Sequence, residues 1–157
     1  MASLFWLFSI PGYALACSCD LDLKVLGKSE KDQIKIARKK AVAVFSGKVL
    51  DITYDEKHRF YYARFRVENS WKNVADEEVV VSGLTMCCLC DWIFEVGKSY
   101  LIYAGKYDSI ENSYRVSHCS RSQLLHDSEM DLKVLGEGKN GQGTKVEPSP
   151  RSKNLVP

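Results

Sequence analysis

The stretch Phe60-Tyr61-Tyr62-Ala63-Arg64-Phe65-Arg66-Val67-Glu68 alternates apolar with polar or charged side chains from Tyr61 onward. Successive side chains of a β-strand point to opposite faces, so a period of two predicts a strand with one buried face and one solvated face. Such a strand needs partners in a sheet. The stretch therefore indicates a fold in which β-structure dominates.

Four further β-rich runs lie at short intervals around this strand, with polar turns between them. Asp55-Glu56-Lys57-His58 has the composition of a turn, and it directly precedes the strand at 60–68. Together the runs favour a mainly β fold, a five-stranded antiparallel barrel or sandwich. The four runs are 44–52, 78–82, 100–104 and 114–117.

A short amphipathic helix is predicted ahead of the strands. Ser29 is the expected N-cap, and Glu30 and Asp32 place acids in the first turn. Apolar residues then recur at helical spacing, while the basic residues face the other way. The apolar positions are Ile34, Ala37 and Ala41.

A second helix is predicted after Cys119, packed on the sheet. Ser120-Arg121-Ser122-Gln123 has the form of a capping box, and Gly136 stands where a glycine would end the helix. One apolar stripe would be formed by Leu125, Ser128, Leu132 and Leu135.

The first residues have the pattern of a secretory signal peptide. An apolar run at 4–10 is followed by Pro11-Gly12 and by Ala14-Leu15-Ala16, whose small residues resemble a cleavage site. We expect a signal peptide at 1–16 and a mature protein that begins at Cys17. The mature chain then has the size of one domain, 17–136, followed by a disordered polar tail, 137–157.

Two other interpretations of this start remain open at the level of sequence. No Lys or Arg precedes the apolar run, and a small residue before Cys17 is also found at lipidation sites. The run is shorter than the ~20 residues that span a bilayer, which disfavours an uncut anchor. The expected location is extracellular, with a periplasmic or lipid-anchored protein as the alternative.

The distribution of charge excludes some functions. The chain has a formal net charge of +2, and the tail accounts for all of it, so the body is neutral. A neutral body gives no electrostatic reason to expect nucleic acid as a partner. No later segment is apolar enough to cross a membrane, so no membrane contact is expected once the signal is cleaved.

An enzymatic function is not expected. His118-Cys119 is the most suggestive pair of a base and a nucleophile, but neighbours on a strand point to opposite faces. Glu77-Glu78 has the character of a strand entry and not of an acid and base pair.

The chain contains six cysteines, for which sequence alone allows 15 pairings. Cys17 and Cys19 are too close in sequence to bridge each other readily, so each is expected to reach a distant partner. A zinc site built from the cysteine cluster with His118 and Cys119 is a weaker alternative, because its Cys-Cys-x-Cys spacing is poor. The other cysteines are Cys87, Cys88, Cys90 and Cys119.

In order along the chain, several motifs resemble the netrin-like domain of the tissue inhibitors of metalloproteinases, in a single-domain form. The Cys17-Ser18-Cys19 motif directly after a signal is the most distinctive of them. The resemblance covers about 17–136. Its other parts are Ala43–Val49, Phe65–Lys72, Cys90, Phe94–Ala104 and Val116–Ser122.

The resemblance implies a fold and a disulfide pattern. The fold would be a five-stranded barrel of the oligonucleotide/oligosaccharide-binding type with flanking helices. Cys19 would pair with Cys119, and Cys17 with Cys90. Cys87 and Cys88 would then be extra: they would bond to each other, stay free, or link two chains in a disulfide dimer.

The resemblance also implies a mechanism, inhibition of a zinc metalloendopeptidase. Cys17 would chelate the zinc of the target protease through its α-amino nitrogen and carbonyl oxygen, and Ser18 would enter the adjoining specificity pocket. No intrinsic cofactor is implied. The remaining contacts with the protease would come from Cys19, Asp20, Cys88, Leu89 and Cys90.

A non-inhibitory function is the alternative. Netrin-like domains also serve as extracellular protein-binding modules, and in such a module Cys17 would only staple the N-terminal segment to the barrel.

Overall fold

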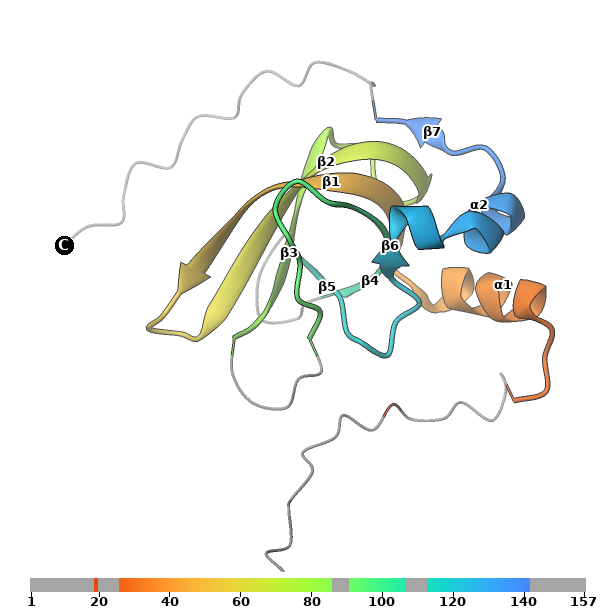
Figure 1. Cartoon of the computed structure of the whole chain (residues 1–157), viewed down its shortest axis with the longest axis horizontal. Coiled ribbons are helices and arrows are strands. Elements are labelled where there is room, and N and C mark those ends of the chain that lie inside the picture. The colour runs from red at the N-terminus through yellow and green to blue at the C-terminus, as the bar shows by residue number, and fades with distance from the viewer. Residues whose placement is uncertain (1–18, 20–25, 86–90, 107–112, 142–157) are drawn as a thin grey trace, which may run out of the picture.

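The computed structural model describes residues 19, 26–85, 91–106 and 113–141. Within them the chain is mainly β, with two short helices, α1 (Glu30–Lys40) and α2 (Glu129–Leu135), side by side at one end of the sheet (Figure 1). Neither described helix is long and apolar enough to cross a bilayer. The predicted signal peptide lies outside the described residues.

Five strands form the main sheet, and two short strands add to its edges. All five predicted strands are present, most of them longer than expected. The strands are β1 (Ala43–Asp55), β2 (Phe60–Lys72), β3 (Glu78–Leu84), β4 (Ser99–Lys106), β5 (Tyr114–Arg115), β6 (Gln123–Leu124) and β7 (Lys139–Asn140).

The main strands close into a ring in the order β1, β2, β3, β5, β4 and back to β1 (Figure 1). Four of the neighbouring pairs are antiparallel, but β3 and β5 are parallel, through Val81 opposite Tyr114. The prediction of a purely antiparallel sheet is therefore wrong at this pair. The reason is geometric: strand direction cannot alternate all the way around a closed ring with an odd number of strands.

The inside of the ring is filled by aromatic and β-branched side chains. The alternation in β2 is confirmed, because Tyr61, Ala63, Phe65 and Val67 are all buried. Phe65 sits at the centre of an aromatic cluster. Its ring lies edge-on to three others, with centroid distances of 5.9 Å to Phe45, 5.0 Å to Phe94 and 6.3 Å to Tyr100.

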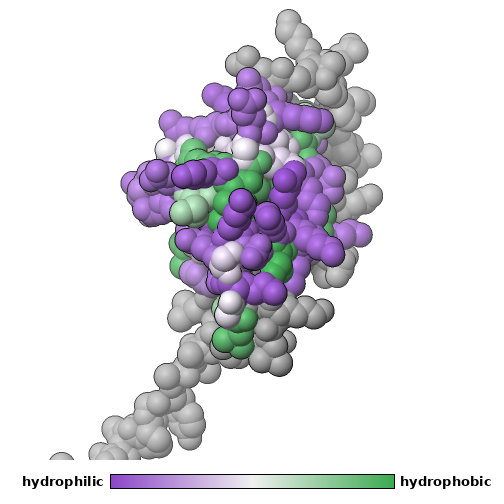
Figure 2. Space-filling model, turned by 90° about the vertical axis from the view of Figure 1, so that its right-hand side faces the viewer, coloured by the Kyte–Doolittle hydropathy of each residue, from purple (hydrophilic) through white to green (hydrophobic). Residues whose placement is uncertain are grey.

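The helices cover the outside of β1 and β4, where a second apolar cluster is buried. Ser29 caps α1 as predicted, because its side chain accepts a hydrogen bond from the backbone N–H of Asp32 at 3.3 Å. This side of the molecule is mostly hydrophilic at its surface, with apolar areas between the hydrophilic residues (Figure 2). The second cluster comprises Ile34, Ala41, Val44, Leu101, Tyr103 and Leu135.

The helix predicted directly after Cys119 begins later than expected. Residues 123–124 pair with β4 as β6, a 3-10 helix (Leu125–Asp127) follows, and α2 starts only at Glu129. The capping-box prediction, in which Ser120 would cap the helix and Gln123 would be its third residue, is wrong because Gln123 belongs to β6 and pairs with Leu101 of β4. Between them, the hydroxyl of Ser122 accepts a hydrogen bond from the backbone N–H of Tyr103 at 2.8 Å. Gly136 does end α2, at a φ of 73°.

The first residues of the predicted polar tail are ordered. Lys139 and Asn140 form β7, which pairs with β2 at Ser70 and Asn69. A side chain at Gly141 would approach the carbonyl oxygen of Val67 to 2.3 Å, so the close approach of this segment requires glycine. The prediction of disorder is therefore wrong for 137–141, and the rest of the tail lies outside the described residues.

Candidate functional site

Cys19 and Cys119 form a disulfide with a Cα–Cα distance of 5.3 Å. This pairing is the one that the family resemblance implies. It joins the start of the chain to the turn after β5, across a sequence separation of 100 residues. A loop of that length loses much entropy when it is cross-linked, so the bond strongly disfavours the unfolded chain.

A second segment lies beside this disulfide. Asp91 forms a β-bridge with Ser117, and the backbone N–H of Trp92 donates to the carbonyl of Val116 at 3.2 Å. The ring of Trp92 packs against His118, with 5.0 Å between the centroids. The residue that follows Cys90 is therefore held against the strand that leads to Cys119.

We call the place where Asp91–Trp92 meets Val116–Cys119 the junction. The carboxylate of Asp91 makes its main polar contacts. One oxygen accepts hydrogen bonds from Nε and Nη2 of Arg115, at 3.0 and 2.8 Å. The other accepts from the backbone N–H of Leu84 at 2.7 Å. The Asp91 side chain is only 6% exposed, so these donors replace the water that it loses on folding.

Tyr61 supports the junction from inside the ring. Its hydroxyl donates to the carbonyl of Trp92. Burial, and after it the negative charge of Asp91, raise the pKa of Tyr61, so the hydroxyl stays protonated as a donor. Gly83 makes room for the ring, because a side chain there would come within 2.5 Å of it.

A partly buried ion pair fixes the turn that carries Cys119. Arg121 donates from Nε and Nη2 to the two oxygens of Asp131, at 2.8 and 3.1 Å, and also to Glu30 at 3.0 Å. The hydroxyl of Tyr103 donates to the same Asp131 at 2.8 Å. Burial and this hydrogen bond raise the pKa of Tyr103. The turn is thereby tied to both helices and to β4.

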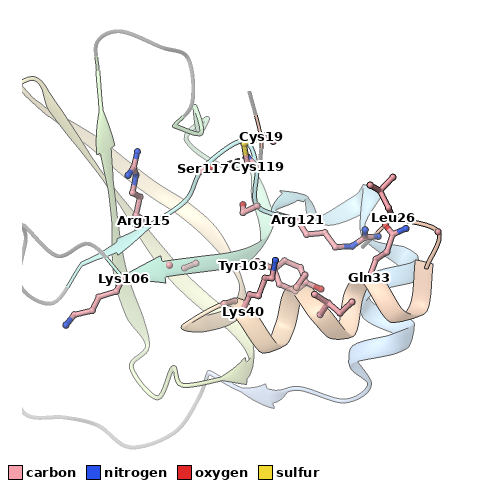
Figure 3. A pocket seen from close by; sticks show the side chains of 17 residues that line it. Cys19, Leu26, Gln33, Lys40, Tyr103, Lys106, Arg115, Ser117, Cys119 and Arg121 are labelled. Atoms are coloured by element: carbon pink, nitrogen blue, oxygen red, sulfur yellow. Dashed lines mark hydrogen bonds between the residues drawn. A yellow bond between two sulfur atoms is a disulfide. The ribbon is translucent and has the colours of Figure 1, made fainter. Parts of the chain in front are cut away.

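An open cleft of about 950 Å³ lies between α1 and the ends of β4 and β5 (Figure 3). The disulfide borders it on one side and Leu26 on the other, and Tyr103 lies over α1 between them. Its described lining holds cationic but no acidic side chains. The cations are Lys40, Lys106, Arg115 and Arg121.

Of the residues predicted to contact a protease, the structure describes Cys19, which is exposed. The remaining ones, and with them the predicted Cys17–Cys90 bond, lie outside the described residues. They are Cys17, Ser18, Asp20, Cys88, Leu89 and Cys90, and Cys87 lies there too.

Sequence reasoning missed the polar groups that build the junction. Asp91 carried one signal, because it is the only charge in the otherwise apolar run from Cys90 to Phe94, and a buried charge requires a partner. Nothing in the sequence indicated that Arg121 would join Asp131 to Glu30, which lies 91 residues away.

The disulfide makes Cys119 unavailable for two of the alternative functions, a zinc site and a nucleophile paired with a base. The sulfur of Cys119 is bonded to Cys19, so it serves neither as a thiolate ligand for zinc nor as a nucleophile beside His118. Over the described part of the chain, no three His, Cys, Asp or Glu side chains gather closely enough to hold a metal ion.

Neither a scan against protein-family models nor a search of curated proteins found a match to the chain.

Proposed function

We propose that the protein is a secreted inhibitor of zinc metalloendopeptidases, built on a netrin-like barrel and acting through the N-terminus of Cys17. The observation that carries the proposal is the junction of Cys19–Cys119 with the Asp91–Ser117 bridge. Cys19 belongs to the first segment that the resemblance assigns to protease contact, and Asp91 directly follows the second. The disulfide also fits the oxidising compartment that a secreted protein encounters.

The closed ring supports the barrel. Five strands in the order β1, β2, β3, β5, β4, with the single parallel pair between β3 and β5, agree with a barrel of the oligonucleotide/oligosaccharide-binding type. The two helices that cover β1 and β4 agree with the flanking helices of the netrin-like form.

The spacing of the anchored residues supports a Cys17–Cys90 bond. Cys17 lies two residues before Cys19, which is bonded to Cys119. Cys90 directly precedes Asp91, whose bridge partner Ser117 lies two residues before Cys119. A chain spans at most about 3.6 Å per residue, so both cysteines are confined to the neighbourhood of one disulfide.

The chemistry of such an N-terminus suits zinc. An α-amino group has a pKa of about 8, so a metal can displace its proton, and nitrogen is a good zinc ligand. The amine and the carbonyl of one residue close a five-membered chelate and displace the water that hydrolysis needs. The Cys17 thiol, once oxidised, would not compete, and disulfides at Cys17 and Cys19 would reduce the ordering cost of binding.

The proposed contacts also set expectations for the target. Ser18 is small and would fill a deep apolar pocket poorly, and Asp20 would bring a carboxylate into the cleft. We infer that a protease with a shallow or polar pocket beside its zinc is the better target.

The test is a titration of protein that begins at Cys17 against a panel of zinc endopeptidases. The matched control carries one additional Ala ahead of Cys17, which turns the amine into an amide. Stoichiometric inhibition that is lost on extension supports the proposal. No inhibition by either form, with the disulfides intact, overturns it in favour of a binding module in which Cys17 is a staple.

A further inference from the structure

The cleft between α1 and the ends of β4 and β5 has an apolar floor. Ile36, Ala37 and Ala41 line it from α1 and the residue that follows this helix, and Ala104 lines it from β4. Ile36 and Ala37 are only partly buried, and Leu26 at the border is 57% exposed. A ligand that covered these side chains would remove apolar surface from water, which favours binding.

The cations of the described lining are spread along the cleft. Arg121 lies on the side of Leu26, whereas Lys106 and Arg115 lie on the opposite side, and Lys40 lies between them at the end of α1 (Figure 3). A small anion is held best by donors that converge on one point. Cations that are spread in this way suit several carboxylates spaced along a chain.

Both arginines are paired with acids that lie outside the lining of the cleft. Arg115 is bonded to Asp91 and Arg121 to Asp131, and these two acidic side chains are only 6% and 2% exposed. Arg121 also donates to Glu30, which is exposed but does not line the cleft. In each pair the cation is therefore the partner that borders the cleft.

The lysines add positive charge to the same surface. Lys40 in the last turn of α1 and Lys106 at the end of β4 are both exposed. The carbonyls at the end of a helix would oppose an anion, but the ammonium group of Lys72 donates to three of them in α1. The electrostatic field at the cleft therefore favours an anionic ligand.

We propose that this cleft binds an extended acidic segment of a partner protein, whose apolar side chains cover the floor and whose carboxylates meet the cations. This inference goes beyond the proposed function, because the site requires neither a zinc ion nor the N-terminus of Cys17. Charge complementarity would speed the encounter and select the partner, and the buried apolar surface would supply most of the affinity.

The experiment titrates protein that begins at Cys17 with three fluorescent hexapeptides, in which Glu alternates with Leu, Val or Phe. At least one of them should bind with saturation, and its affinity should fall as the salt concentration rises. The same peptide with Lys in place of each Glu should bind about tenfold more weakly or worse. In NMR spectra, the bound peptide should shift the methyl signals of Ala37, Ala41 and Ala104.

A pair of double variants tests the charges. Lys40→Gln with Lys106→Gln should raise the dissociation constant of the peptide by about tenfold. The matched control is Lys31→Gln with Lys35→Gln, which removes the same charge from α1 at positions outside the lining. We expect the control to change the dissociation constant by less than about twofold.

A pair of single variants tests the apolar border. Leu26→Ser should raise the dissociation constant by about threefold or more, because less apolar surface is covered. Met130→Ser is the control, since Met130 of α2 is also exposed but lies outside the lining. It should bind the peptide as the wild type does.

The form with one Ala ahead of Cys17 separates this inference from the proposed function. It should bind the peptide with unchanged affinity, whether or not any protease is inhibited. Equal dissociation constants for the two double variants, or no shift of the three alanine methyl signals, would overturn the inference. If dodecanoate shifts these signals and no peptide does, the cleft binds a small amphipathic anion and the inference is overturned as well.

Discussion

The ammonium group of Lys72, at the end of β2, donates to the carbonyl of Arg38 at 3.0 Å in the last turn of α1. It also donates to the carbonyls of Lys39, at 3.1 Å, and of Ala41. The last carbonyls of a helix lack partners within the helix and carry partial negative charge. One side chain of the sheet therefore caps α1 and fixes it against the ring.

Replacing this cap should destabilise the fold. We expect Lys72→Met to lower the free energy of unfolding by about 1 to 3 kcal/mol, because a charge-assisted cap is lost while the aliphatic stem is kept. Urea denaturation at pH 7 measures the change.

Lys35→Met is the matched control for this prediction. Lys35 lies in the same helix, is exposed, and approaches Asp32 only to 4.0 Å. An equal loss of stability in the two variants would contradict the capping role of Lys72.

Ser46 offers a substitution that should stabilise the protein. Its hydroxyl is the one buried side-chain polar atom of the described residues that has no hydrogen-bond partner. We expect Ser46→Ala to raise the free energy of unfolding by about 1 kcal/mol, because an unsatisfied buried hydroxyl is removed with little change in shape.

Ser122→Ala is expected to act in the opposite direction. Ser122 is also buried, but its hydroxyl satisfies the backbone N–H of Tyr103. Its loss should cost about 1 to 3 kcal/mol. Thermal unfolding of both variants beside the wild type checks the two signs, and a destabilised Ser46→Ala would show that this hydroxyl has a role.

The local sequence pattern was sufficient to predict those helices and strands whose structure depends on residues within the element itself. The period of two in β2 predicted which of its side chains are buried, and Ser29 with the acids after it predicted where α1 begins. The Cys19–Cys119 bond was found only through the family resemblance, because six cysteines do not determine their own pairing.

The errors arose where a distant part of the chain decides the local structure. Ser120 and Gln123 have the form of a capping box, yet Gln123 pairs with β4 as part of β6. Lys139 and Asn140 have the composition of a tail, yet β3 pairs with β2 only as far as Arg66, and β7 pairs with β2 beyond that point. The Arg121–Asp131–Glu30 network joins three separate segments, so no window of sequence contains it.

The Cys19–Cys119 bond should make a large contribution to stability. Closing a loop of about 100 residues is expected to disfavour the unfolded chain by about 3 to 5 kcal/mol. The double variant Cys19→Ser with Cys119→Ser should lose that amount in urea denaturation under non-reducing conditions. A loss below about 1 kcal/mol would contradict this prediction and would indicate that the bond constrains the unfolded chain only weakly.

The buried hydroxyl of Tyr103 predicts how stability depends on alkaline pH. Burial and the hydrogen bond to Asp131 raise the pKa of Tyr103 above its usual value near 10. Between pH 10 and the raised pKa, the unfolded chain releases a proton that the folded chain keeps. The contribution of Tyr103 is therefore complete below pH 10 and is lost as the pH rises toward the folded pKa.

Tyr103→Phe separates this contribution from other alkaline titrations. We expect the variant to be less stable at pH 7, because Asp131 loses a donor, and to show a shallower decline of the unfolding free energy between pH 9 and 11. Tyr54→Phe, at a side chain that is 66% exposed, should leave the slope unchanged. If the wild type and Tyr103→Phe decline in parallel, Tyr103 does not keep its proton in the folded state, and the buried contact with Asp131 is refuted.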